Sequence, residues 1–134
     1  LMIPSTGFAE ASADGARLQS RLLEIARSKG MRLLGPNCMG FINFKKEVVA
    51  SFGAFLEKPR DLTAGNIGFV SQSGAFGARV VRRCLSRGVG LTYEVSTGNE
   101  ADIQSLDFIE CPVLSLPIRA EQVNQQRSVQ TGHQ

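Results

Sequence analysis

Residues 66–95 decide the fold of this chain, and they read NIGFVSQSGAFGARVVRRCLSRGVGLTYEV. The small and apolar residues Asn66–Val70 predict a buried strand, and Ala75–Arg87 has the apolar spacing of a helix that Gly88 ends. A second strand is predicted at Val89–Val95. The helix residues expected to face inward are Phe76, Val80, Val81, Cys84 and Leu85. Two strands joined by a helix at this spacing are typical of a parallel pair with a crossover connection.

The chain on both sides of this unit continues the alternation of helices and strands. Downstream, the spacing of Ile103, Leu106 and Ile109 predicts the start of another helix. Upstream, Ala13–Lys29 predicts a helix that stops before Gly30, with an apolar stripe at Leu18, Leu22, Ile25 and Ala26. Short strands are predicted at Met31–Leu34, Phe41–Phe44 and Val48–Phe52. The predicted fold class is therefore α/β, a parallel sheet with crossover helices.

Length and composition favour an ordinary globular protein. The 134 residues suit about one domain, with 43% hydrophobic residues, 20% charged residues and a net charge of +3. The basic residues are mostly scattered, and the densest cluster is Arg79, Arg82, Arg83 and Arg87. We interpret that cluster as a solvated helix face, so no nucleic-acid partner is expected. No apolar run approaches the roughly 20 residues that span a bilayer, and Leu1-Met2-Ile3-Pro4 is not expected to belong to a signal peptide.

The cysteine pattern points to neither a disulfide framework nor a metal site. Cys38, Cys84 and Cys111 lie far apart and form no C-x-x-C pair. A reducing cytoplasm is the expected compartment, and no metal ligands are expected. After Glu110 the character of the chain changes. Residues 111–118 are apolar but carry two prolines, and residues 120–134 are polar and rich in Gln, so the tail 111–134 is predicted not to fold.

The turn Ser71-Gln72-Ser73-Gly74 is the candidate site for an anion. Ligands in open α/β sheets lie beyond the carboxyl ends of the strands, and this turn follows a strand and opens a helix. Backbone N–H groups at a helix N-terminus lack intrahelical acceptors and lie at the positive end of the dipole, so a phosphate is favoured there. Gly74 would allow close approach. The plainer alternative is an N-cap, in which Ser73 satisfies the helix end and binds nothing.

Two other sites are weaker hypotheses for the same turn. A dinucleotide fingerprint needs G-x-G-x-x-G, which does not occur in the chain. A nucleophile elbow needs Gly at positions 71 and 75, where the chain has Ser and Ala. A serine hydrolase could still combine Ser73 with Asp102 or Asp107 and with His133, the only histidine. Because His133 lies at the end of a polar tail, it is a poor candidate for a rigidly held base.

Four segments in order resemble one enzyme family. They are Gly7-Phe8-Ala9-Glu10, Gly35-Pro36-Asn37-Cys38-Met39-Gly40, Ser71-Gln72-Ser73-Gly74-Ala75 and Ser96-Thr97-Gly98-Asn99-Glu100-Ala101-Asp102. Together they resemble the NDP-forming acetate–CoA ligases and, more distantly, the α subunit of succinyl-CoA ligase, over about residues 3 to 109. Each motif is weakly specific by itself, whereas the ordered set is specific. The resemblance implies a flavodoxin-like, succinyl-CoA ligase-like fold, here incomplete.

The resemblance also implies a reaction and roles for particular residues. Such enzymes join a carboxylic acid to coenzyme A (CoA) at the expense of ATP or GTP with Mg, through an acyl phosphate and a phosphorylated histidine. It implies that Ser71, Gln72, Ser73 and Gly74 bind the phosphate or phosphohistidine. It places Phe8, Ala9 and Glu10 beside CoA, and Asn37 and Cys38 near its thiol end. A small buried residue is the alternative for Cys38.

The departures from the family predict an inactive piece of the enzyme. The family has a complete CoA-binding domain before Gly7, and its phosphorylated histidine lies in a motif that the region around His133 does not match. Ala78 stands about where the succinyl-CoA ligase α subunit carries a substrate-holding tyrosine, which argues against succinate. We therefore expect residues 1–12 to be the end of a CoA-binding domain, residues 13–110 a truncated ligase domain and residues 111–134 a tail foreign to the family.

Partners follow from the same resemblance. The full-length form is expected to be oligomeric and to use an ATP-grasp domain or subunit, because no nucleotide site is visible in this chain. The alternative from another class is a regulatory module of a protein acetyltransferase that senses CoA metabolites. The neighbouring sequence would distinguish the two, since one has an ATP-grasp domain and the other an acetyltransferase domain.

Overall fold

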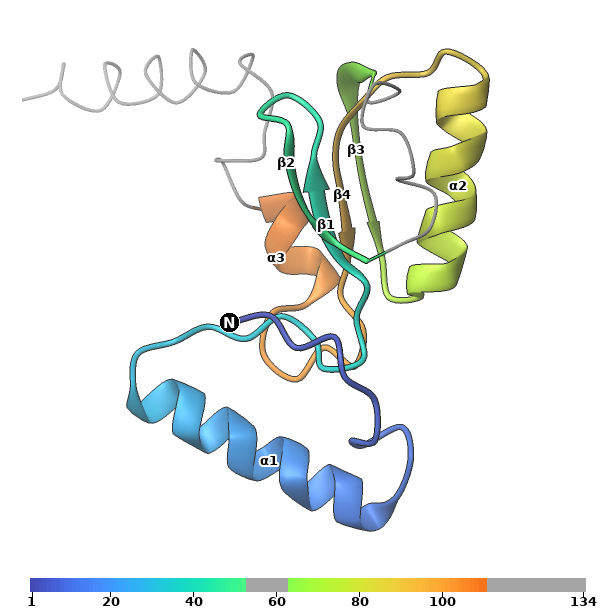
Figure 1. Cartoon of the computed structure of the whole chain (residues 1–134). Coiled ribbons are helices and arrows are strands. Elements are labelled where there is room, and N and C mark those ends of the chain that lie inside the picture. Colours follow the sequence, from blue (N-terminus) through green and yellow to red (C-terminus); the bar gives the residue numbers. More distant parts are fainter. Residues whose placement is uncertain (53–62, 111–134) are drawn as a thin grey trace, which may run out of the picture.

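A computed structural model describes residues 1–52 and 63–110 of the chain. The described elements, in chain order, are helix α1 (Ala13–Ser28), strands β1 (Gly40–Asn43), β2 (Val48–Ser51) and β3 (Ala64–Ser71), helix α2 (Gly74–Ser86), strand β4 (Leu91–Ser96) and helix α3 (Ser105–Glu110). The four strands form one sheet in the order β2-β1-β4-β3. Figure 1 shows α2 and α3 beside this sheet, with α1 lying apart from it below the strands.

The unit β3–α2–β4 confirms the central prediction. β3 and β4 are parallel, with Gly68 opposite Tyr93 and Ser71 opposite Ser96, and α2 makes the crossover between them. Val81 of α2 is fully buried and packs with Ile42, Phe44 and Leu91, while Cys84 and Leu85 cover the cluster. The α/β class and the crossover helix are therefore as the sequence predicts.

The other half of the sheet differs from the predicted parallel arrangement. β1 is antiparallel both to β2 and to β4, so the sheet is mixed. For β1 and β2 the physical reason is the length of the connection: residues 44–47 alone join them, which makes a hairpin, whereas a parallel crossover needs a dozen residues or more. Glu47 in this turn has φ +53°, a left-handed conformation typical of tight turns. The predicted strand Met31–Leu34 is reduced to one bridge, between Met2 and Leu34.

Several side chains predicted to be buried are exposed. β3 was expected to be buried, but it lies at the sheet edge, and Ile67 is 51% exposed. Phe76 at the start of α2 is 58% exposed, although its ring centroid lies 6.4 Å from that of Phe69 on β3. In α1 only Ala26 of the predicted stripe is buried, and Leu18 and Ile25 are exposed, because α1 is not packed on the sheet.

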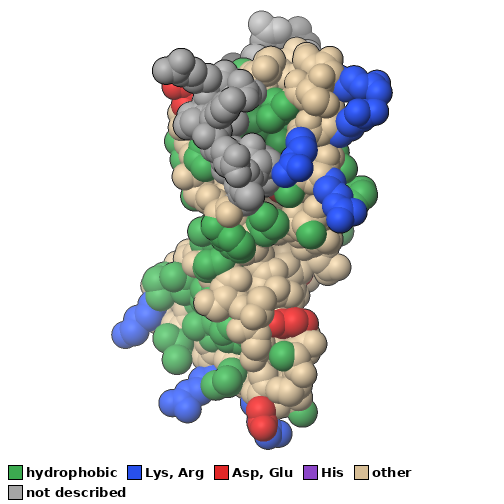
Figure 2. All heavy atoms as spheres, turned by 45° about the vertical axis from the view of Figure 1, so that its right-hand side comes forward, with side chains coloured by type: hydrophobic (Ala, Val, Ile, Leu, Met, Phe, Trp, Pro, Cys, Tyr) green, Lys and Arg blue, Asp and Glu red, His purple; other side chains and the backbone are tan. Residues whose placement is uncertain are grey.

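A second apolar cluster lies on the opposite side of the sheet from α2. Leu34, Cys38 and Val95 are buried there, and Phe41, Ile103 and Phe108 pack against them. On the face shown in Figure 2, the Lys and Arg side chains stand in separate groups and do not form one continuous patch. Within residues 1–52 and 63–110, no helix combines the length and the apolar character that crossing a bilayer requires. The tail predicted not to fold, residues 111–134, lies outside the described residues.

Candidate functional site

The turn before α2 is an N-cap with spare hydrogen-bond donors. Ser73 has an extended backbone, and its Oγ accepts the N–H of Phe76 at 3.3 Å, while its carbonyl accepts the N–H of Gly77 at 2.9 Å. Helix geometry leaves the N–H groups of Gly74 and Ala75 without intrahelical acceptors. The first turn of α2 contains no acidic residue to neutralise the dipole. The predicted cap is confirmed, and its side chain accepts from Phe76 and not from Gly74 or Ala75.

Contacts from two other segments fix the position of this turn. The N–H groups of Thr97 and Gly98, just after β4, donate to the carbonyls of Ser71 (3.0 Å) and Gln72 (3.2 Å). Gly74 lies directly against Met39: a Cβ at Gly74 would come within 2.3 Å of Met39 Cγ. The glycine is therefore required by close packing, since any side chain would displace Met39.

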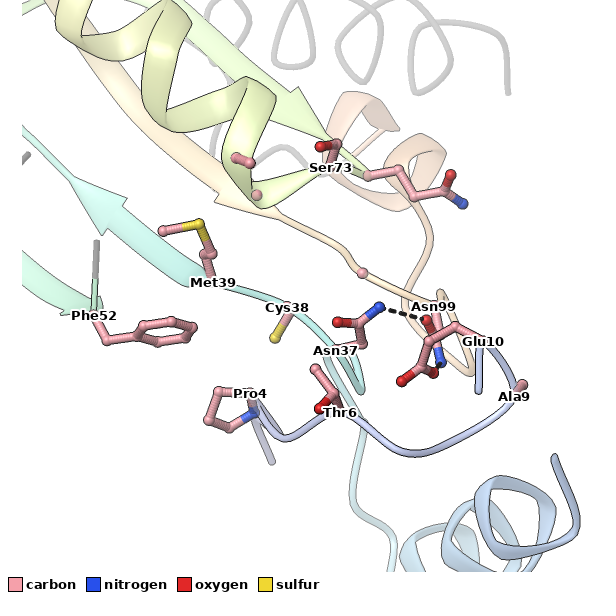
Figure 3. Close-up of a pocket in the computed structure, with 14 residues that line it drawn as sticks. Pro4, Thr6, Ala9, Glu10, Asn37, Cys38, Met39, Phe52, Ser73 and Asn99 are labelled. Carbon is pink, nitrogen blue, oxygen red and sulfur yellow. Dashed lines mark hydrogen bonds between the residues drawn. The ribbon is translucent and has the colours of Figure 1, made fainter. Parts of the chain in front are cut away.

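A cavity of about 670 Å³ brings the two predicted groups of residues together (Figure 3). Its walls contain Gln72, Ser73 and Gly74 from the phosphate turn, and Ala9, Glu10, Asn37 and Cys38 from the predicted CoA-proximal set. The remaining lining residues are Pro4, Thr6, Met39, Phe52, Ala75, Gly98 and Asn99. Cavities of this size hold cofactors and drug-sized ligands. Residues from opposite ends of the described chain thus line one cavity.

Two of the predicted site residues do not line this cavity. Ser71 donates its hydroxyl to the carbonyl of Ser73 at 3.0 Å, so it stabilises the turn without lining the cavity. Phe8 is half-buried, and its carbonyl accepts the N–H of Ala11 at 2.9 Å before α1 begins. Both residues support the lining segments.

Glu10 contributes an ionised carboxylate to the cavity wall. Its side chain accepts a hydrogen bond from the Asn99 amide and two from the N–H groups of Gly7 (2.7 Å) and Phe8 (3.2 Å). These bonds, that from Asn99 above all, lower the pKa of Glu10 to about 2 because they stabilise the charged form. The carboxylate is exposed and carries its charge throughout the neutral range.

Cys38 is a buried thiol at the base of the site. It is 1% exposed, and its Sγ donates to the carbonyls of Ile3 (3.4 Å) and Leu34 (3.8 Å). Burial raises the pKa of the Cys38 thiol above its ordinary value, since the thiolate would lose hydration. Its environment is that of a small packing residue, the alternative considered from the sequence.

Asn99 is a site residue to which the sequence analysis assigned no role. It lies in the Ser96–Asp102 motif, just beyond the carboxyl end of β4. Its Nδ2 donates to Glu10 and to Gln19 Oε1 (2.9 Å), and its Oδ1 accepts from Asn37 Nδ2 at 3.2 Å. Figure 3 shows Glu10, Asn37 and Asn99 converging on one wall of the cavity. The available signal was its position after a parallel strand, where ligands of such sheets lie.

The described residues of the hydrolase hypothesis form hydrogen bonds with other groups. Ser73 Oγ caps α2, and Asp102 accepts hydrogen bonds from Arg32 Nε and from the N–H of Leu33, both at 2.9 Å. Asp107 Oδ2 accepts the N–H of Gln104 at 2.7 Å. His133 lies outside the described residues. Within residues 1–52 and 63–110, no group of three or more His, Cys, Asp or Glu side chains is arranged to hold a metal ion.

Comparisons with known proteins identify relatives of this chain. Residues 64–113 match the family described as the succinyl-CoA ligase-like flavodoxin domain. The chain is therefore related to the NDP-forming acid–CoA ligases. It is 37% identical over 110 residues to the ADP-forming acetate–CoA ligase II subunit alpha of Pyrococcus furiosus, covering 82% of this chain and 23% of that protein. It is 39% identical over 109 residues to ADP-forming acetate–CoA ligase I of Archaeoglobus fulgidus, covering 81% of this chain and 15% of that protein.

A solved structure of the same kind confirms the fold. The dinucleotide-forming acetyl-coenzyme A synthetase 1 of Candidatus Korarchaeum cryptofilum, in complex with phosphate and ADP, superposes with a TM-score of 0.72 at 33% identity. The match covers 85% of this chain and 24% of that structure. This chain therefore spans less than a quarter of the length of these relatives.

Proposed function

We propose that this chain provides part of the CoA- and phosphate-handling site of an NDP-forming acid–CoA ligase. One observation carries the proposal: the start of α2 and the segment Ala9–Glu10 face the same cavity, together with Asn37 and Cys38. Relatives named as CoA ligases use an acid, a nucleotide and CoA, so a site that takes both a phosphate and an extended cofactor is what such chemistry needs.

The residues present fit both groups. At the phosphate end, the amides of Gly74 and Ala75 and the hydroxyl of Ser73 supply donors, and the α2 dipole supplies positive potential. At the other end, the amides of Asn37 and Asn99 and the carboxylate of Glu10 offer both donors and acceptors. CoA, when bound, supplies a thiol that attacks an acyl phosphate to give the thioester and release phosphate. The described residues orient these groups; they include no phosphorylated histidine.

In this proposal, other parts of the complete enzyme carry out the remaining steps of the reaction. A phosphorylated histidine and an ATP-grasp domain or subunit with ATP or GTP and Mg would complete the enzyme. Residues 1–12 would be the end of the CoA-binding domain and residues 13–110 part of the ligase domain. The chain by itself is then a binding unit for phosphate and CoA, with a small carboxylic acid as the substrate of the complete enzyme.

The first experiment measures anion binding at α2. Inorganic phosphate or sulfate at millimolar concentration is expected to raise the melting temperature, because a ligand of the folded state stabilises it in proportion to RT ln(1 + [L]/Kd). Ser73→Ala should reduce this rise. It should also destabilise the unliganded protein by about 1 kcal/mol, because it removes an N-cap.

Ser12→Ala is the matched control. Ser12 caps α1 in the same way, with its Oγ accepting the N–H of Gly15 at 3.0 Å, but it does not line the cavity. This variant should lose similar stability and keep the full phosphate-induced rise. No rise in wild type, or an equal rise in Ser73→Ala, would contradict the proposed anion site.

A further inference from the structure

The side chain of Asn99 joins three segments that are distant in sequence. Its hydrogen-bond partners are Glu10, 89 positions away, Gln19, 80 positions away, and Asn37, 62 positions away. Its backbone N–H also donates to the carbonyl of Pro36 at 2.9 Å. One amide thus contacts the segment before α1, α1 itself and the loop before β1.

Of these, the segment before α1 and α1 itself have little support from the sheet, whereas the loop before β1 is mostly buried. Figure 1 shows α1 apart from the strands, and the segment that leads into α1 is mostly exposed. Asn99, in contrast, follows a residue that is held firmly. The N–H of Gly98 donates to the carbonyl of Gln72, and Gly98 packs so closely that a Cβ there would lie 2.3 Å from the Pro36 carbonyl oxygen. Asn99 therefore links the end of β4, which is held in place, to the exposed segment before α1 that forms part of the cavity wall.

We propose that Asn99 is a positioning residue that fixes Glu10 and Asn37 in the cavity wall, so that CoA meets a preformed surface. The inference rests on the proposed function. Asn99 donates to one oxygen of Glu10 while the N–H groups of Gly7 and Phe8 donate to the other. A side chain held in this way presents a fixed polar edge to a ligand, and each of the two amide groups in the CoA arm can donate or accept a hydrogen bond there. Preorganisation of this kind raises affinity because the wall is not ordered anew on binding.

An exchange of donor and acceptor tests the pair. Asn99→Asp sets a second carboxylate against Glu10, and the two repel. The double variant Glu10→Gln/Asn99→Asp restores one donor and one acceptor with their places reversed, while the oxygen of the new amide still accepts from Gly7 and Phe8. By isothermal titration of the full chain with CoA, Asn99→Asp should bind about tenfold or more weakly, and the double variant should recover most of this loss.

The matched control and a second measurement separate the possible failures. Asn66→Asp makes the same change of charge on exposed β3, outside the cavity, and should leave CoA binding unchanged. Hydrogen exchange at the Gly7 and Phe8 amides should accelerate in Asn99→Asp and slow again in the double variant, whether or not CoA is present. Unchanged exchange in Asn99→Asp, or no recovery in the double variant, overturns the positioning role. If the variants show this exchange pattern but wild type does not bind CoA, the proposed function alone is contradicted.

Discussion

Glu94 is an acidic residue that the fold buries in the sheet. It lies on β4 opposite Ile42 of β1 and Phe69 of β3, and it is 2% exposed. Its carboxylate occupies space left by Gly77 of α2, where a Cβ would lie 2.9 Å from Glu94 Oε1. Burial raises the pKa of Glu94 to about 7, because the charged form loses its hydration.

A pH dependence of stability follows from Glu94. The folded protein holds this proton up to about pH 7, and the unfolded chain releases it near 4.5, so stability should fall as pH rises between these values and stay level above them. Glu94→Gln removes the cost of ionisation and should stabilise the protein by up to about 3 kcal/mol at pH 8, with little gain at pH 4.5. Urea unfolding at both pH values measures this, and an equal effect of the variant at both would contradict the assignment.

Long-range polar contacts join the helices and strands, and Asp102 makes several of them. Its carboxylate accepts from Arg32 Nε and from the N–H of Leu33, which is fully buried. It thereby connects the loop after β4 to the segment between α1 and β1. Arg32 is largely exposed, so the ion pair itself contributes little. The hydrogen bond to Leu33 has the larger role, since its loss leaves a buried donor without its partner.

Asp102→Ala should therefore destabilise the protein by about 2 kcal/mol in urea unfolding. Asp14→Ala is the control: Asp14 pairs with Arg17 on the exposed surface of α1, and its loss should cost about 0.5 kcal/mol or less. If the two variants lose the same stability, the Leu33 hydrogen bond does not connect the segments as we argue.

At the scale of the whole molecule, the sheet of the described residues has two edge strands of different character. β2 has four residues and follows the charged Lys45 and Lys46, which discourage pairing with another sheet. β3 has eight residues with no Lys or Pro, and exposed Ile67 lies on it. Leu106 and Ile109 of α3 are also exposed. A long apolar edge of this kind is prone to self-association.

Light scattering across a range of protein concentrations should reveal this self-association. Ile67→Lys places a charge on the β3 edge and should shift the protein toward the monomer mass. Val48→Lys makes the same change at exposed Val48 of β2 and should have little effect. Monomeric wild type at all concentrations, or equal effects of the two variants, would show that β3 does not mediate association.

Local pattern was sufficient for the β3–α2–β4 unit and for its cap. The apolar spacing of α2, the position of Ser73 and the glycine at 74 all depend on neighbours within a few residues, and such signals are present in the sequence itself. The resemblance of the four ordered motifs indicated the candidate site residues. Of these, Ala9, Glu10, Asn37, Gln72, Ser73 and Gly74 line one cavity.

Tertiary structure alone decided the antiparallel half of the sheet, the exposure of β3 and α1, and the convergence of Glu10, Asn37 and Asn99. Apolar spacing shows that a side chain can be buried, but burial also needs a partner surface, which α1 and the outer edge of β3 lack in the described part of the chain. Glu10 and Asn99 are 89 positions apart, and no local pattern encodes which distant polar groups will meet. The path of the chain determines that meeting, because hydrogen bonds form only where folding brings donor and acceptor within about 3 Å.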